Sequence, residues 1–173
     1  MASGADVPDG DIPIRVVLAD DSYLVREALE HVLAAADELS VVAAVADRDA
    51  LLQAVDEQQP HVVVTDIRMP PTETDEGLQV AATLRETHPG VGVVVLSQYA
   101  EPRYGLALFD GGSDRRAYLL KERLKDEGEL ARALHEVAEG GSVVDPHIVE
   151  RLVGAQSGSV ASRVPGWVSE ARQ

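Results

Sequence analysis

The most constraining feature of this sequence is a regular alternation between two hydrophobic patterns. Short, valine-rich apolar runs are bounded by Asp, Pro or Gly, and segments with the spacing of amphipathic helices follow them. Continuous apolar runs of this length are typical of strands covered on both faces, as in a parallel sheet. The predicted strands are Ile14–Ala19, Val41–Ala46, Val62–Thr65, Val91–Leu96 and Ala117–Leu120.

The clearest helical pattern follows the first predicted strand, where an apolar stripe runs from Leu24 to Leu33. Weaker patterns occur at about 51–57, 78–87, 104–109 and 130–137. Five strand–helix pairs predict a doubly wound α/β domain with a five-stranded parallel sheet. Right-handed crossovers then place helices on both faces of the sheet.

A short extra helix is predicted near the C-terminus, within residues 140–154. Asp145 is a suitable N-cap, Pro146 suits the first turn, and Gly154 follows the last apolar residue. From residue 155 to 173 the chain is rich in Ser, Gly and Ala, which predicts a linker or disordered tail.

Composition excludes several classes of protein. The 173 residues contain no cysteine, so disulfide scaffolds, thiolate zinc sites and cysteine nucleophiles are excluded. No apolar run approaches the roughly 20 residues of a membrane span, and the N-terminus lacks a secretory pattern, so a cytoplasmic protein is expected. The net charge of −15 opposes direct binding to nucleic acid.

Polar side chains follow the predicted strands at the ends where parallel sheets bind ligands. The first strand is followed by Asp20 and Asp21, the third by Asp66, the fourth by Ser97 and the fifth by Lys121. Close carboxylates repel one another unless a cation lies among them, and a hard divalent ion such as Mg²⁺ suits oxygen ligands. Each residue alone could be a helix cap or loop residue, but their joint placement predicts a site for Mg²⁺ and a phosphoryl group.

Four strings in this order resemble the receiver domain of two-component response regulators: Val17–Ser22, Thr65–Pro70, Val95–Ser97 and Tyr118–Lys121. The string Ser97-Gln98-Tyr99 and the absence of a proline after Lys121 are similar to the NarL/LuxR-type subgroup. The resemblance covers about residues 14–137. It implies a flavodoxin-like fold with strand order 2-1-3-4-5.

The resemblance also implies roles for single residues. Asp66 would accept a phosphoryl group from a sensor histidine kinase. Mg²⁺ would be held by Asp21, Asp66 and the backbone carbonyl of Arg68, with Asp20 acting mainly through water. Such a protein is a phosphoacceptor and not a turnover enzyme.

Three further residues receive roles from the same resemblance. Lys121 would offset charge on the phosphoryl oxygens, Ser97 would hydrogen-bond one of them, and Tyr118 would change rotamer with that serine. The fourth helix, fifth strand and fifth helix would form the responding face. A homodimer is possible, and control of transcription is the expected output.

The chain is expected to divide into a flexible N-terminus at 1–12, a receiver at 13–139, the extra helix at 140–154 and a linker or disordered tail at 155–173. The predicted tail is too short to form the DNA-binding domain that is usual in the subgroup. DNA contact is therefore expected only through an effector domain absent from this chain, and a stand-alone receiver stays an alternative.

Two other functions stay open at this point. A haloacid-dehalogenase-like phosphohydrolase also uses an aspartyl phosphate, but it needs an acid two residues after its nucleophile, and Ser22 stands two residues after Asp20. A phosphorylation-independent interaction module would keep only the fold and not the phosphorylation.

The sequence departs from the commonest receivers at two places. The loop Pro71–Gly77 is longer and more acidic, and Arg115-Arg116 stands where small residues are frequent.

Overall fold

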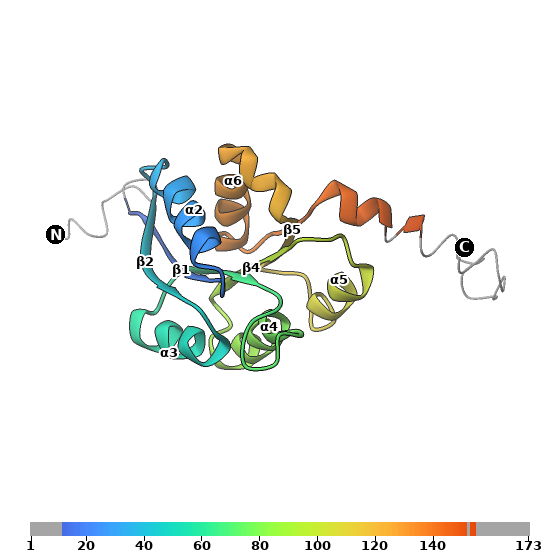
Figure 1. The fold of residues 1–173 in the computed structure, drawn as a ribbon, viewed down its shortest axis with the longest axis horizontal. Helices are drawn as coiled ribbons and strands as arrows, with labels where there is room; N and C mark the ends of the chain where they lie inside the picture. The colour runs from blue at the N-terminus through green and yellow to red at the C-terminus, as the bar shows by residue number, and fades with distance from the viewer. Residues whose placement is uncertain (1–11, 152, 155–173) are drawn as a thin grey trace.

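Six parallel strands form one sheet in the order β2-β1-β3-β4-β5-β6 in the computed structural model of the chain (Figure 1). The structure describes residues 12–151 and 153–154. The strands are β1 (Ile14–Ala19), β2 (Leu39–Val45), β3 (Val62–Asp66), β4 (Gly92–Ser97), β5 (Arg116–Leu120) and β6 (Ser142–Val144). The doubly wound α/β fold and the order 2-1-3-4-5 are confirmed, with one strand added at the β5 edge.

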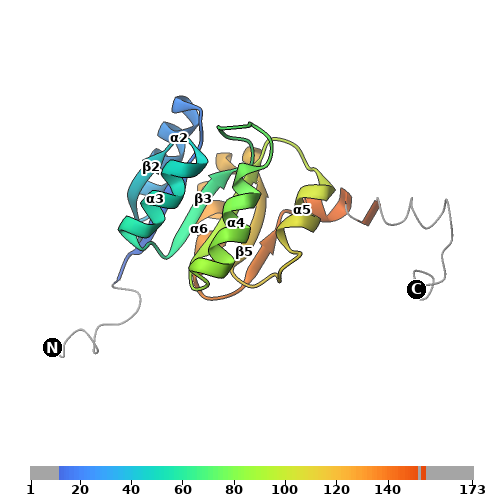
Figure 2. The same ribbon diagram turned by 90° about the horizontal axis from the view of Figure 1, so that it is seen from below.

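The helices form a layer on each face of the sheet (Figures 1 and 2). Two of them, α2 and α6, cover one face, and α3, α4 and α5 cover the other. The helices are α2 (Tyr23–Ala34), α3 (Arg48–Gln58), α4 (Glu76–Thr87), α5 (Pro102–Leu108) and α6 (Glu127–Ala138), and a 3₁₀ segment η2 (Lys121–Lys125) follows β5. None of the helices in the described ranges is long and apolar enough to cross a membrane.

The sheet separates two hydrophobic cores, and this explains the continuous apolar runs. In β3, Val62 and Val64 pack toward α2 and α6, whereas Val63 packs toward α3, α4 and α5. Successive strand side chains point to opposite faces, and both faces here are covered. All three valines are fully buried.

Helix starts follow the capping residues in the sequence. The Ser22 hydroxyl accepts a hydrogen bond from the Val25 N–H of α2, and the Asp47 carboxylate accepts one from Ala50 in α3. These bonds satisfy N–H groups that have no partner within the helix. They fix where each helix begins beyond the strand ends.

The expected five-stranded sheet is wrong in number, because β6 pairs in parallel with β5. Residues Ser142–Val144 lie within the segment 140–154 that the sequence predicts to contain the extra helix. This strand has only three residues and lies half-exposed at the sheet edge, so it carries no long apolar run. The extra helix begins after it: residues 146–151 and 153–154 are helical, and the Asp145 carboxylate accepts a hydrogen bond from the His147 N–H at 2.9 Å.

The predicted tail at 155–173 and nearly all of the predicted flexible N-terminus lie outside the described residues.

Candidate functional site

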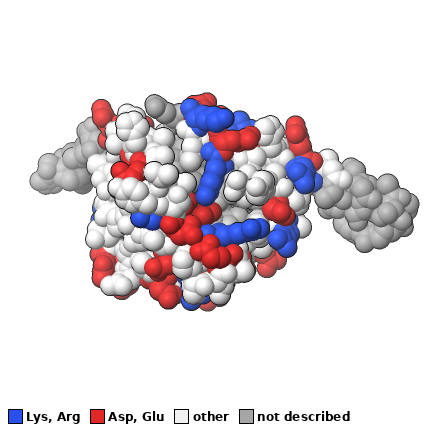
Figure 3. Space-filling model, in the orientation of Figure 1, with Lys and Arg blue, Asp and Glu red and all other residues white. Residues whose placement is uncertain are grey.

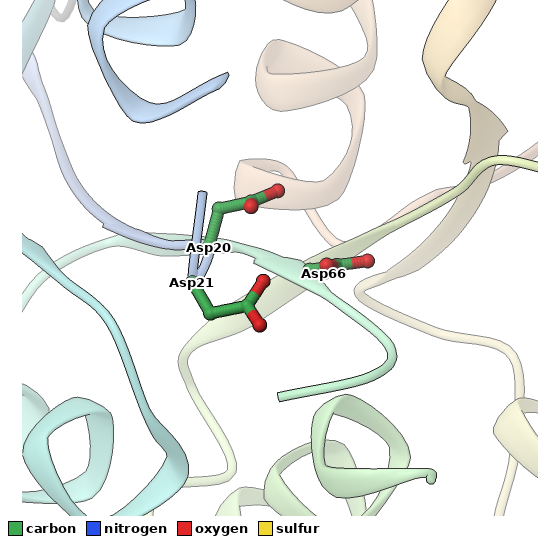
Figure 4. Close-up of side chains that lie close together, drawn as sticks. All are labelled: Asp20, Asp21 and Asp66. Atoms are coloured by element: carbon green, nitrogen blue, oxygen red, sulfur yellow. The ribbon is translucent and has the colours of Figure 1, made fainter. Parts of the chain in front are cut away.

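Three carboxyl groups lie together where β1 and β3 end, and Figure 4 shows their side chains extending toward the same space. Asp20 and Asp21 follow β1, and Asp66 is the last residue of β3. One oxygen from each lies within 4.8 Å of the others. This juxtaposition arises because β1 and β3 are neighbours in the sheet, although residues 20–61, with two helices and strand β2, separate them in the chain.

A cavity of about 240 Å³ surrounds the three acids. Its lining includes Ser97 after β4 and Lys121 after β5, so the structure brings together the predicted acidic, hydroxyl and ammonium groups. Arg68, two residues after Asp66, also lines the cavity. Acidic and basic side chains gather at the middle of the face shown in Figure 3, between the two helix layers.

Asp66 is one of the two acids that contact Lys121, and both are largely buried. Burial raises the pKa of Asp66 to about 6, and repulsion by Asp20 adds to the rise. Attraction by Lys121 and a 2.8 Å hydrogen bond from the Ile67 N–H oppose it. The carboxyl group is therefore mostly ionised at neutral pH and is held at a cost in stability.

Lys121 is the counter-charge of the acids. Its ammonium nitrogen lies 3.1 Å from an Asp20 oxygen and 3.4 Å from an Asp66 oxygen. Burial alone would lower the pKa of Lys121, but attraction by Asp66 and Asp20 outweighs it and raises the pKa. The lysine is thus a cation held directly beside the predicted phosphoacceptor.

Ser97 and Tyr118 are joined by the loop after β4. The Ser97 hydroxyl donates to the Tyr99 carbonyl at 2.6 Å, and the Glu101 N–H donates to the Tyr118 hydroxyl at 3.2 Å. The Tyr118 ring is fully buried. The serine and the tyrosine therefore both hydrogen-bond the backbone of the loop after β4.

The long loop after β3 contributes to this site, which the sequence did not predict. Glu73 from that loop lines the cavity beside the three aspartates. Its carboxyl group lies within hydrogen-bond reach of Asp21, and this contact raises the pKa of Glu73. The acidity of the loop was visible in the sequence, but its direction relative to the strand ends was not.

The comparisons with known proteins decide the family. A family model for the response regulator receiver domain matches residues 16–134. The chain belongs to the response regulator receiver family. The resemblance seen in the sequence is therefore confirmed, including its NarL-type character, because similar regulators are found among both sequences and structures.

Two curated regulators and one solved receiver show this similarity. The transcriptional regulatory protein DegU of Brevibacillus brevis is 32% identical over 140 residues, which are 81% of this chain and 56% of DegU. The oxygen regulatory protein NreC of Staphylococcus carnosus is 31% identical over 81% of this chain and 62% of NreC. The signal receiver domain of NarL from Mycobacterium tuberculosis is 29% identical with a TM-score of 0.66, over 75% of this chain and 98% of that domain.

The receiver spans 56–62% of the length of these two curated relatives. Its acidic cavity has the donor set that a hard divalent cation prefers, namely several carboxylate oxygens with room for water. The residues present therefore fit the Mg²⁺ expected from the sequence.

Proposed function

We propose that this receiver accepts a phosphoryl group on Asp66 from a sensor histidine kinase and thereby controls transcription. The observation that carries the proposal is the contact of the Asp66 carboxylate with the Lys121 ammonium, at 3.4 Å, within a cavity that also holds Asp20 and Asp21. A nucleophilic carboxylate, a cation-binding acid pair and a fixed ammonium are the groups that phosphoryl transfer needs.

Mg²⁺ would be held by Asp21, Asp66 and the backbone carbonyl of Arg68, with Asp20 acting mainly through water. When bound, the ion supplies positive charge that offsets the charge of the transferring phosphoryl oxygens.

In the proposed reaction, an Asp66 oxygen attacks the phosphorus of a phosphohistidine in line with the leaving nitrogen. The new P–O bond forms as the P–N bond breaks, and the imidazole nitrogen leaves with the electron pair. Lys121 donates hydrogen bonds to a phosphoryl oxygen, which stabilises its charge. Protein residues thus mainly orient the groups and complement their charge.

The output is a change of conformation. The acyl phosphate on Asp66 would carry about two negative charges in place of the single charge of the carboxylate, and it would add three acceptor oxygens. We infer that the Ser97 hydroxyl then turns from the Tyr99 carbonyl to a phosphoryl oxygen and that Tyr118 follows with the loop after β4. This conformational change would alter the surface formed by α5, β5 and α6.

We further propose that this face pairs with a second copy or contacts an effector domain that binds DNA. The names of the similar DegU and NreC proteins support a regulatory output. The cytoplasm, where histidine kinases present their phosphohistidine, is the proposed location.

The proposed role is that of a phosphoacceptor and not of a turnover enzyme. The position two residues after Asp20, where a haloacid-dehalogenase-like phosphohydrolase needs a second acid, holds Ser22, whose hydroxyl caps α2. No observation in the described residues favours that reaction.

Mass spectrometry tests the assignment. With Mg²⁺ and acetyl phosphate, the wild-type chain should gain about 80 Da, the mass of one phosphoryl group, whereas Asp66→Asn should not. Asp49→Asn, at an exposed position of α3, is the matched control and should be labelled like the wild type. Equal labelling of the wild type and Asp66→Asn would overturn the assignment of Asp66.

A further inference from the structure

The long loop between β3 and α4 is folded around a buried acid. The Glu76 side chain is fully buried at the start of α4, and its carboxylate accepts hydrogen bonds from the Thr72 N–H at 2.6 Å and the Thr74 N–H at 3.0 Å. The Thr72 hydroxyl donates to the same carboxylate. Burial alone would raise the pKa of Glu76, but these hydrogen bonds outweigh it and lower the pKa to about 2.

The loop is tied to the end of β3 at two further points. The Gly77 N–H donates to the Ile67 carbonyl at 2.8 Å, and the Glu73 N–H donates to the Met69 carbonyl at 2.8 Å. Glu73 itself has a φ of +57°, in the left-handed region that residues other than glycine rarely adopt. The loop therefore holds the Glu73 backbone in one defined conformation next to the acidic cavity.

Glu73 adds a negative charge at the mouth of that cavity. Its side chain lines the cavity together with Asp21 and Asp66, and its carboxyl group is within hydrogen-bond reach of Asp21. Among the described residues, the acids whose oxygens all lie within 4.8 Å of one another are the three aspartates, and Glu73 is not a member of this set. Two touching carboxylates repel each other unless a cation is near.

We propose that Glu73 is a fourth acid of the divalent-cation site and acts on the ion through one of its bound waters. Mg²⁺ keeps several waters in protein sites, and a carboxylate beside a direct ligand is well placed to accept a hydrogen bond from one of them. Glu73 is thus a positioning residue for Asp21 and for the hydrated cation. This inference rests on the proposed function, because it deepens the account of the same cation site.

Titration with Mn²⁺, followed by the electron paramagnetic resonance signal of the free ion, tests this role without any phosphorylation. Glu73→Gln should weaken Mn²⁺ binding about tenfold, the order found when outer partners of metal ligands are removed. Glu86→Gln removes the same charge from an exposed position of α4, away from the cavity, and should bind like the wild type. Displacement of Mn²⁺ by Mg²⁺ should likewise show weaker Mg²⁺ binding by Glu73→Gln than by the wild type and Glu86→Gln.

Water-proton relaxation separates an outer role from direct ligation. The number of waters bound to Mn²⁺ should be the same in Glu73→Gln and the wild type, and an increase by one would overturn the water-mediated role. Binding by Glu73→Gln as tight as that of Glu86→Gln would overturn the inference altogether.

Asp21→Asn distinguishes failure of this inference from failure of the proposed function. If Asp21→Asn loses Mn²⁺ binding while Glu73→Gln keeps it, the cation site stands and only the role of Glu73 falls. If Asp21→Asn binds as tightly as the wild type, the ion is not held at these acids, and both proposals fall.

Discussion

Replacing Asp66 by asparagine should stabilise the cation-free receiver, and the gain should depend on pH. Burial raises the pKa of Asp66 from an ordinary value of 3.8 to about 6. At pH values between these two pKa values, the folded state binds more protons than the unfolded state. The free energy of unfolding therefore falls as pH rises through this range. Asparagine cannot ionise, and the variant should lack this loss.

The magnitude follows from the two pKa values. One pKa unit corresponds to about 1.4 kcal/mol, so the interval from 3.8 to about 6 gives a destabilisation of about 3 kcal/mol once Asp66 is fully ionised. The Asp66 side chain is only 13% exposed, so screening by solvent reduces this figure little. About half of the difference should be present near pH 5 and nearly all of it at pH 7.

Urea unfolding followed by circular dichroism measures the effect. The free energy of unfolding should be compared between wild type and Asp66→Asn at several values from pH 5 to pH 8, with a chelator present to remove divalent cations. Glu86→Gln controls for the loss of one negative charge at an exposed position. A difference that stays flat over this range, or a variant less stable than the wild type at pH 7, would refute the reasoning.

Two further substitutions test how the site is held. Gly77→Ala would place a Cβ atom 2.1 Å from the Asp66 carbonyl oxygen and should lower the free energy of unfolding by about 3 kcal/mol, whereas Gly90→Ala, with open space around it, should change it little in the same urea titration. Asp145→Asn should cost about 2 kcal/mol in thermal or urea unfolding, because Arg123 donates two hydrogen bonds to the buried Asp145 carboxylate, at 2.7 and 3.1 Å. Equal stability of the two glycine variants, or an unchanged midpoint for Asp145→Asn, would contradict these assignments.

Most of the candidate site could be predicted from the sequence, because its members occupy equivalent places in a repeated unit. Asp20, Asp66, Ser97 and Lys121 each follow an apolar run, and parallel strands bring such positions to one edge. Local patterns also placed the Asp145 cap correctly. Strand β6 escaped this reasoning because an edge strand of three residues has no periodicity of its own.

What the sequence by itself determined is the α/β alternation and the chemistry at the strand ends, since both depend on residue types at short spacing. Only the tertiary structure decided that Glu73 turns toward Asp21, that the buried Glu76 organises the loop carrying it, and that Lys121 contacts both Asp20 and Asp66. These contacts join residues that are distant in sequence or lie in an irregular loop. Their geometry depends on how the layers pack and on which buried polar groups find partners, and no local pattern encodes that.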